Sequence, residues 1–268
     1  MEKETNIILI RGGGDLASGI AVRLHRSGYS VVITELPHPL AVRRWVAFSE
    51  AVLQGEWIVE GITGVKVNTL TELVQAHTRK QIPVAVDPLG EWIEFIRPKV
   101  IVDARMRKTH PEDGVNIAPL VIGLGPGFCA GVDCDAVIET QRGHFLGRVY
   151  WNGTAESDSG IPDSVSGKKG ERVLRSPEDG VLKVAAKIGE MVDEGQTIAM
   201  VNDKNVTAMF SGVIRGLLYD GLFVYKGMKI GDVDPRNDSN YCALVSDKSL
   251  AIGGAVLEAV ISRGFYPG

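Results

Sequence analysis

Short apolar runs alternate with helical patterns along the first half of the chain. The apolar runs lie at residues 6–10, 29–35, 82–87, 99–104 and 119–125, and the helical patterns cover residues 15–27, 40–54 and 70–81. Short β-rich runs that alternate with helices are typical of a parallel sheet covered by helices. The pattern therefore predicts an α/β fold for residues 1–155, with a Rossmann-like parallel sheet.

The second half of the chain contains an internal repeat. Residues 152–172 are rich in Gly, Ser and Asp, and we assign residues 156–172 to a linker. Beyond it, residues 180–201 align with residues 212–233, an offset of 32 residues. Each copy alternates apolar and polar residues and has glycines at turn positions, so each needs its twin to bury its apolar face. We therefore expect a small all-β domain over residues 173–238.

The last segment, residues 239–268, contains one amphipathic pattern. Residues 247–264 read as a helix closed by Gly264. We expect this helix to return to the first domain and pack on it.

Composition and charge narrow the class of protein. The chain has 44% hydrophobic and 23% charged residues, which is ordinary for a soluble globular protein. A net charge of -4 provides no positive field for nucleic acid or an anionic membrane. The amino terminus has too few consecutive apolar residues for a signal peptide or membrane span, so we expect a cytoplasmic protein.

A glycine-rich loop follows the first apolar run. Gly12, Gly14 and Ala17 in "RGGGDLASG" have the spacing of a dinucleotide-binding turn. Glu35 ends the second run, 21 residues beyond Gly14, where an acid accepts hydrogen bonds from an adenosine ribose and repels a 2′-phosphate. This predicts NAD rather than NADP, with the backbone N–H groups of residues 12–16 around the pyrophosphate. The predicted ligand-binding residues of this loop and strand are Gly12, Gly13, Gly14, Asp15, Leu16, Ala17 and Glu35.

The same loop has other interpretations. A tight turn between a strand and a helix can bind nothing at all. Asp15 places a carboxylate where the helix dipole would otherwise attract phosphate. It either caps the helix and leaves Gly13 and Gly14 for a ligand, or it marks a protein that has lost the nucleotide.

Two further loops follow apolar runs. The segment "VDARMRK" brings Asp103, Arg105 and Arg107 to the carboxyl end of a strand, where open α/β sheets bind ligands. Arginine forks suit phosphate or carboxylate, so the loop is a candidate anion site; an ordinary solvated loop is the alternative. Gly125 and Gly127 flank a proline in "GLGPGF", and we expect this rigid bend to form a pocket wall.

The cysteines and histidines do not predict a metal site. Cys129 and Cys134 lie five residues apart, a poor spacing for a metal ligand pair, and with Cys242 they make an odd number. We expect reduced thiols, with Cys129 and Cys134 as buried structural residues. His144 is a candidate general base, but the spacing ties no acid or nucleophile to it.

The lysine between the two repeats raises the question of a covalent cofactor. The paired repeats resemble a lipoyl/biotinyl-like barrel-sandwich hybrid, and Asp203-Lys204 matches the pair often found at a lipoyl hairpin. The methionines that flank a biotinylated lysine are missing, and no acyltransferase or carboxylase segment accompanies the repeats. We therefore expect neither lipoyl nor biotin on Lys204.

The order of these motifs resembles one family, the YqeB-like accessory proteins of selenium-dependent molybdenum hydroxylase systems. The motifs are "IRGGGDLASGIAVRL", "ITELPHPLAVRR", "DARMRK", "GLGPGFCAGVDCDAVIETQRGHFLGRV" and "DKSLAIGGAVLEAV". The resemblance implies a role in molybdenum cofactor maturation, with a hydroxylase client or other maturation proteins as partners. It implies no particular reaction, and it leaves a homo-oligomer open. The amino-terminal cysteine motif of the distantly similar XdhC-type factors has no counterpart, so no sulfur-carrying role follows.

The sequence is therefore compatible with two functions. The first is an accessory protein that binds NAD or a molybdopterin-type dinucleotide through its glycine loops and the "DARMRK" cations. The second is an NAD-dependent oxidoreductase in which His144 or Asp103 assists proton transfer. An oxidoreductase needs a base with an orienting partner, and the sequence reveals no complete catalytic constellation.

Overall fold

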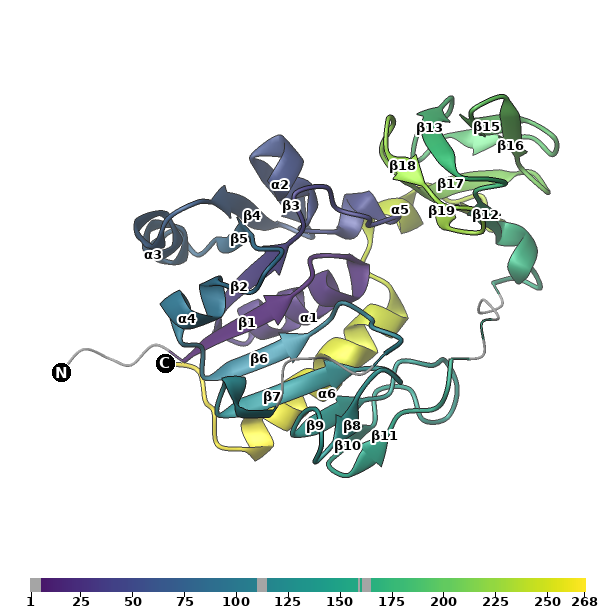
Figure 1. The fold of residues 1–268 in the computed structure, drawn as a ribbon. Coiled ribbons are helices and arrows are strands. Elements are labelled where there is room, and N and C mark those ends of the chain that lie inside the picture. Colours follow the sequence, from purple (N-terminus) through teal and green to yellow (C-terminus); the bar gives the residue numbers. More distant parts are fainter. Residues whose placement is uncertain (1–5, 110–114, 159, 161–164) are drawn as a thin grey trace. The chain divides into compact units, whose positions relative to one another are not determined.

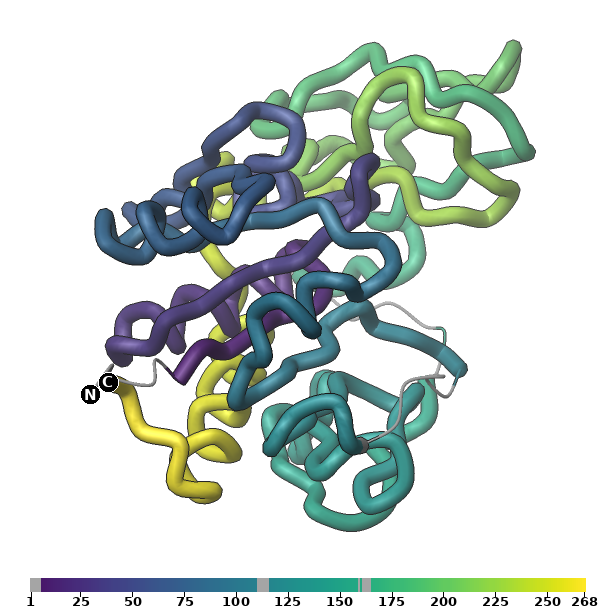
Figure 2. The backbone as a smooth tube through the Cα atoms, turned by 60° about the vertical axis from the view of Figure 1, so that its left-hand side comes forward, coloured from purple at the N-terminus to yellow at the C-terminus, as the bar shows by residue number. Residues whose placement is uncertain are grey.

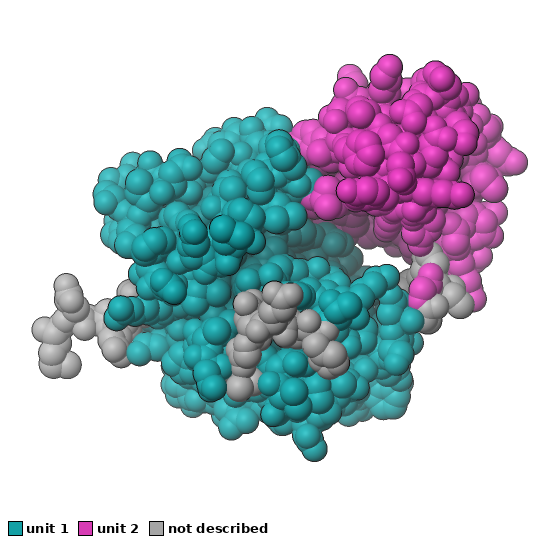
Figure 3. All heavy atoms as spheres, in the orientation of Figure 1, with its two compact units in different colours: residues 1–39, 47–158, 245–268 teal, residues 40–46, 159–244 magenta. Residues whose placement is uncertain are grey.

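The computed structural model describes residues 6–109, 115–158, 160 and 165–268. The chain divides into two compact units (Figure 3). Unit 1 comprises residues 1–39, 47–158 and 245–268, and unit 2 comprises residues 40–46 and 159–244. A short stretch of the first half thus belongs to the β-rich unit.

Unit 1 is built on a nine-stranded sheet with the order β10-β9-β7-β6-β1-β2-β5-β4-β3 (Figure 1). The seven strands from β9 to β4 are parallel, and the two edge strands are antiparallel. The strands are β1 (Ile7–Arg11), β2 (Ser30–Glu35), β3 (Glu56–Val59), β4 (Ile62–Val67), β5 (Ile82–Val86), β6 (Val100–Asp103), β7 (Leu120–Leu124), β9 (Ala136–Ile138) and β10 (Val149–Tyr150). The predicted α/β class is confirmed.

Helices complete unit 1. They are α1 (Asp15–Arg26), α2 (Glu50–Gln54), α3 (Leu70–Thr78), α4 (Trp92–Ile96), the 3-10 turn η2 (Val115–Ile117) and α6 (Asp247–Ser262), and a small ladder joins β8 (Cys129–Ala130) to β11 (Gly153–Thr154). On one face of the central strands, α3 and α4 cover a core that contains Leu9, Val32 and Ile101. Helix α3 begins at Leu70, where its pattern predicts it. Thr69 caps it, because the Thr69 side chain accepts a hydrogen bond from the Glu72 N–H.

The carboxyl-terminal helix returns to unit 1, as predicted. Helix α6 lies along α1 (Figure 2). The approach is close because glycines face each other: a Cβ on Gly253 would lie 2.8 Å from the Gly19 carbonyl oxygen, and one on Gly19 would lie 2.5 Å from Ser249 Cβ. Glycine thus permits the two helix backbones to touch.

The helix predicted over residues 40–54 is wrong. The structure has a 3-10 turn, η1 (Arg44–Val46), and the short α2, separated by irregular backbone. The Phe48 N–H donates to Ser18 Oγ and the Ser49 N–H to the Gly13 carbonyl. These donors bind the glycine loop instead of carbonyls four residues back, so a continuous helix does not form.

Unit 2 forms two four-stranded sheets, ordered β12-β19-β17-β14 and β16-β15-β13-β18. Its strands are β12 (Val173–Arg175), β13 (Gly180–Val184), β14 (Met191–Val192), β15 (Thr197–Val201), β16 (Lys204–Thr207), β17 (Gly212–Leu217), β18 (Phe223–Val224) and β19 (Lys229–Asp234), with the turns η3 (Gly170–Arg172) and α5 (Asn240–Ala243). The two copies of the repeat exchange strands: β13 of the first pairs with β18 of the second, and β14 pairs with β17. Each copy therefore completes the sheet of its twin.

Two adjacent glycines of α6 provide a matched test of the contact between α1 and α6. No atom lies within 4 Å of a Cβ on Gly254, whereas one on Gly253 collides with α1. We expect Gly253→Ala to lower the free energy of unfolding by about 1–3 kcal/mol through overpacking. Gly254→Ala should raise it by up to about 1 kcal/mol through helix propensity. Chemical denaturation of both variants checks this, and equal effects would contradict it.

Candidate functional site

The predicted site residues gather at the carboxyl edge of the unit 1 sheet. Strand β1 has β2 on one side and β6 on the other, with Arg11 beside Thr34 and Asp103. The strand order therefore reverses between β1 and β6, and such a switch point is where open α/β sheets bind ligands. The loops after these two strands touch, because a Cβ on Gly12 would lie 3.4 Å from the Ala104 carbonyl oxygen.

The glycine loop uses its first two N–H groups internally. The Gly12 N–H donates to the Thr34 carbonyl and the Gly13 N–H to Glu35 Oε2, both at 2.7 Å. Of the predicted cradle over residues 12–16, the N–H groups of residues 14–16 therefore remain as candidates, at the N-cap and in the first turn of α1. The first N–H groups of a helix have no partner within the helix.

Glu35 ends β2 and ties the loop to that strand. Its Oε2 accepts from Gly13 and its Oε1 from the Leu36 N–H, at 2.7 Å each. Burial raises the pKa of Glu35, and these two hydrogen bonds act in the opposite direction. Because a carboxylate has about four acceptor sites, a ribose hydroxyl can still bind beside the two N–H groups.

The three loop glycines differ in their surroundings. A Cβ on Gly13 would lie 3.0 Å from the Ser49 nitrogen, so packing leaves no room there. Gly14 has an extended backbone with φ -68°, and no atom lies within 4 Å of its Cβ position. The space in front of α1 is therefore open at Gly14. Asp15 and Leu16 are half-buried in the first turn, and Ala17 is buried.

The Asp103 carboxylate is held by two guanidinium groups. Arg105 Nε donates to both of its oxygens, at 2.9 and 3.1 Å, and Arg105 Nη2 also contacts Oδ2. Arg11 Nη1 lies 3.8 Å from Oδ2. Arg11 and Asp103 are both buried. Sequence reasoning missed Arg11, although it is a charged residue at the end of an apolar strand.

The second glycine loop packs on the loop that follows β6. A Cβ on Gly127 would lie only 2.1 Å from the Arg107 carbonyl oxygen, and one on Gly125 would lie 3.0 Å from Thr140 Oγ1. Between the two arginines, Met106 has φ 55°, an uncommon conformation for a residue with a side chain. Gly125 and Gly127 thus shape the backbone around residues 105–107.

A groove crosses the face of the sheet that α4 covers, from Arg11 and Gly90 at the carboxyl edge to the segments that precede β6 and β7. Its volume is about 910 Å³, and Arg11, Gly90, Ile93, Arg97 and Ile117 are among its lining residues. Of the described residues of the glycine loop and Glu35, none lines it. Arg11 connects the groove with the carboxyl end of β6, because it lines the groove and pairs with Asp103.

The candidate base and the thiols have separate surroundings. His144 is exposed and stacks edge-on against Phe145. Cys134 is buried, and burial raises the pKa of its thiol to about 12. Cys129 is half-buried rather than buried, which corrects half of that prediction. In the part of the chain that the structure describes, no cluster of three His, Cys, Asp or Glu residues could hold a metal ion.

Lys204 begins β16 in unit 2. Its Nζ lies 2.5 Å from Glu178 Oε2, and 60% of its side chain is exposed. The expected lack of lipoyl or biotin on this lysine stays a prediction.

Fold and site define an α/β protein with a Rossmann-like unit and a small β unit made of two intertwined repeats. No family model matches the chain. The chain is a homologue of the uncharacterized protein YqeB of Escherichia coli (strain K12), with 43% identity over 255 residues. The alignment covers 95% of this chain and 47% of that protein, so the chain spans about half the length of its curated relative.

Similarities to solved structures are weak. An aspartoacylase family protein from Mesorhizobium loti is 13% identical, with 86% of this chain and 85% of that chain covered and a TM-score of 0.27. A succinylglutamatedesuccinylase/aspartoacylase from Rhodobacter sphaeroides is 19% identical over 25% of this chain and 22% of that chain, with a TM-score of 0.22. Scores this low carry no argument about fold or function. Among the described residues, no helix is both long and apolar enough to cross a membrane.

The thiol environments lead to a direct test. We expect a disulfide reagent at pH 8 to modify Cys129 in the native protein and to leave Cys134 and Cys242 unmodified, because burial raises the pKa of both buried thiols. All three should react in denaturant. Mass spectrometry of the labelled peptides measures this, and rapid native labelling of Cys134 would contradict the structure.

Proposed function

We propose that the chain is an accessory protein for a selenium-dependent molybdenum hydroxylase and binds a dinucleotide or another pyrophosphate-bearing ligand at its glycine-rich loop. The observation that carries the ligand class is the open space at Gly14, in front of the first turn of α1 at the switch point between β1 and β6. Helix N–H groups and the helix dipole favour an anion at such a position.

The surrounding residues support a dinucleotide with two distinct halves. On the β2 side, Glu35 offers acceptors to a ribose, which favours NAD over NADP. On the β6 side, the Arg105 backbone lies beside Gly12, and its guanidinium, with 30% of the side chain exposed, supplies a positive charge for an anionic group. NAD and a molybdopterin-type dinucleotide both have the required pyrophosphate.

The maturation role rests on the resemblance of the whole motif order, and the site chemistry is compatible with it. The proposed partners are a molybdenum hydroxylase client and other maturation proteins. The alternative, an NAD-dependent oxidoreductase, gains no support from its two candidate bases. Asp103 is buried and paired with Arg105 and Arg11. His144 is exposed on a turn that does not belong to the glycine loop. We therefore favour ligand binding over proton transfer.

Replacement of Gly14 tests the cradle. The backbone at Gly14 is extended and an added Cβ meets no atom within 4 Å, but the side chain of valine would occupy the space that a phosphate needs. We expect Gly14→Val to fold with a slightly lower melting temperature, because valine is a poor N-cap residue, and to weaken binding of the dinucleotide by at least about tenfold. The dinucleotide is first identified by mass spectrometry of the ligand that copurifies, and titration calorimetry measures its binding.

A matched control separates this effect from a general effect of valine. Gly170 in unit 2 also has no atom within 4 Å of its Cβ position, so Gly170→Val should leave the affinity unchanged. If Gly14→Val binds the ligand as tightly as wild type, the loop is only a turn between β1 and α1. If wild type binds neither NAD nor a pterin dinucleotide, the proposed ligand class is wrong.

Replacement of Glu35 tests nucleotide selectivity. Glu35→Gln retains an acceptor for the Gly13 N–H, whereas Glu35→Ala also releases the loop from β2. If the ligand is NAD, we expect Glu35→Gln to weaken NAD by about tenfold and to relax discrimination against NADP, because the repulsive charge is lost. Calorimetric titration with both nucleotides gives the ratio of dissociation constants. An unchanged ratio would remove Glu35 from the ribose site.

A further inference from the structure

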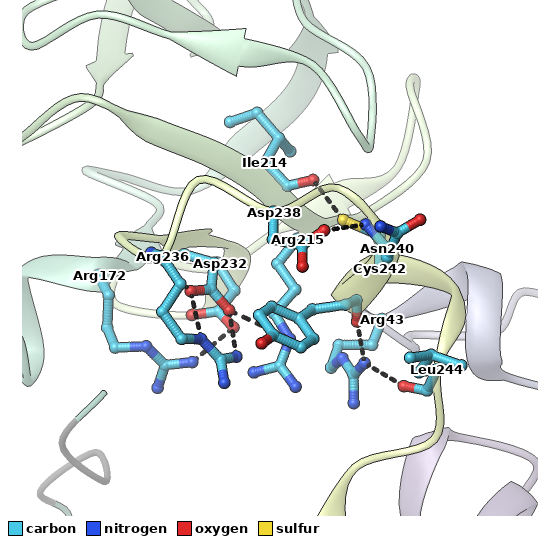
Figure 4. A network of polar contacts seen from close by, with 12 residues as sticks. Arg43, Arg172, Ile214, Arg215, Asp232, Arg236, Asp238, Asn240, Cys242 and Leu244 are labelled. Carbon is cyan, nitrogen blue, oxygen red and sulfur yellow. Dashed lines mark hydrogen bonds and ion pairs between the residues drawn. The ribbon is translucent and has the colours of Figure 1, made fainter. Parts of the chain in front are cut away.

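Unit 2 contains a cluster of four arginines that come from separate parts of the chain. Arg43 precedes η1, Arg172 ends η3, Arg215 lies in β17 and Arg236 follows β19. Figure 4 shows their guanidinium groups in a row, with Asp232 of β19 among them. We call Arg43, Arg172, Arg215 and Arg236 the arginine cluster.

Two buried aspartates of β19 fix the ends of two of these side chains. Arg236 binds Asp234 through two hydrogen bonds, Nε to Oδ1 at 2.9 Å and Nη2 to Oδ2 at 2.6 Å. Arg172 Nη2 binds Asp232 Oδ2 at 2.7 Å. Both aspartates are 1% exposed. They therefore serve as rigid supports that orient the guanidinium groups.

Backbone and ring contacts orient the remaining groups. Arg43 Nη2 donates to the carbonyl oxygens of Tyr241 and Leu244, at 3.0 and 2.9 Å. The Arg236 guanidinium stacks on the Tyr241 ring at 4.1 Å. These contacts hold planar guanidinium groups in defined positions, which is typical of sites that recognise oxyanions.

Arg215 contributes a buried nitrogen without a hydrogen-bond partner to the cluster. This nitrogen, Nε, lies 3.6 Å from Asp234 Oδ2, an oxygen that already accepts from Arg236. Burial and the positive charge of Arg43 lower the pKa of Arg215 to about 10, although Asp232 and Asp234 act in the opposite direction. Burial therefore disfavours the positive charge of Arg215 in the absence of a bound anion.

We propose that the arginine cluster is a binding site for a phosphate-type oxyanion, namely inorganic phosphate, pyrophosphate or a phosphate ester. An oxyanion would supply an acceptor to the buried Nε of Arg215. An oxyanion also supplies several acceptors at once, which suits side chains that present parallel N–H groups. The side chain of Arg236, 34% exposed, offers the ligand a route to the more buried groups.

This site is distinct from the glycine loop. It uses guanidinium side chains of unit 2, whereas the glycine loop uses backbone N–H groups of unit 1. The inference does not depend on the proposed dinucleotide, and the two sites can be tested separately. Gly14→Val provides a background in which the glycine loop should not bind pyrophosphate.

Calorimetric titration of the full chain with inorganic pyrophosphate tests the proposal. In the Gly14→Val background we expect saturable binding that is at least about tenfold weaker after Arg215→Gln. Arg215→Gln should fold, because Asp234 keeps both hydrogen bonds from Arg236. Arg215→Lys should give an intermediate affinity, since it keeps the charge and loses the planar fork.

Arg175→Gln is the matched control. Arg175 is an exposed arginine of β12 in the same unit, outside the arginine cluster, and its loss changes the net charge equally. We expect wild-type affinity in this variant. Melting curves with and without pyrophosphate provide a second readout, since a ligand that binds the folded state raises the melting temperature. This rise should be lost in Arg215→Gln and kept in Arg175→Gln.

Three results would overturn the proposal. One is no binding of phosphate or pyrophosphate to the folded protein, and another is equal affinity in Arg215→Gln and Arg175→Gln. The third is binding of citrate while both phosphates are silent, which would indicate a polycarboxylate site. If Arg215→Gln fails to fold, Arg236→Gln takes its place, and retained pyrophosphate binding in that variant would also count against the proposal.

Discussion

The backbone N–H and carbonyl groups of Gly13 join four parts of unit 1. Its N–H donates to the Glu35 carboxylate at the end of β2, and its carbonyl accepts from the Ser49 N–H before α2 and from the Ser18 hydroxyl in α1. A side chain at Gly13 would press on Ser49. Because one residue serves β1, β2, α1 and the chain before α2, the loop has little freedom to move. The open position at Gly14 therefore lies on a rigid support, which would reduce the entropy lost on binding of the proposed ligand.

The elements predicted well are those whose pattern is local. The central strands are buried on both faces and read as continuous apolar runs, and the repeat at a fixed offset revealed the β unit before any strand pairing was known. The hairpin formed by β3 and β4 was missed. Its two-residue turn places Glu60 at φ 45° and Gly61 at φ 81°, and glutamate is not a residue that marks such a turn. The segment 40–54 failed for a different reason, because long-range bonds to Gly13 and Ser18 override its helical pattern.

The part of the candidate site that follows a known spacing of residues could be predicted from the sequence. The rule for dinucleotide turns located Gly12, Gly14 and Glu35, but it assigns no role to the segment that packs on Gly13. Ser49 and Glu50 are buried there, and no motif in the sequence marks them. The arginine cluster lay beyond sequence reasoning, since its members are dispersed from residue 43 to residue 236. The fold of unit 2 brings them together.

Carboxylates at the strand ends of unit 1 share one structural role. Glu35 at the end of β2 binds backbone N–H groups, and three more acids, at the ends of β5, β6 and β9, also bind loop backbone. Asp87 accepts from the N–H groups of Gly90, Glu91 and Trp92, and Glu139 accepts from those of Gln141 and Glu156. Asp103 binds the guanidinium and the N–H of Arg105.

Each of these acids therefore holds loop backbone in place, either after its own strand or, for Glu35 and Glu139, in another loop as well. A general base must hold an acceptor toward the substrate proton, whereas these oxygens are directed at backbone N–H groups and arginines. The edge that in an oxidoreductase would present acid–base groups is thus built to hold loops in place. Preorganised loops with fixed N–H groups suit the recognition of a bound anion, and this is the physical reason to favour a binding role at this edge over proton transfer.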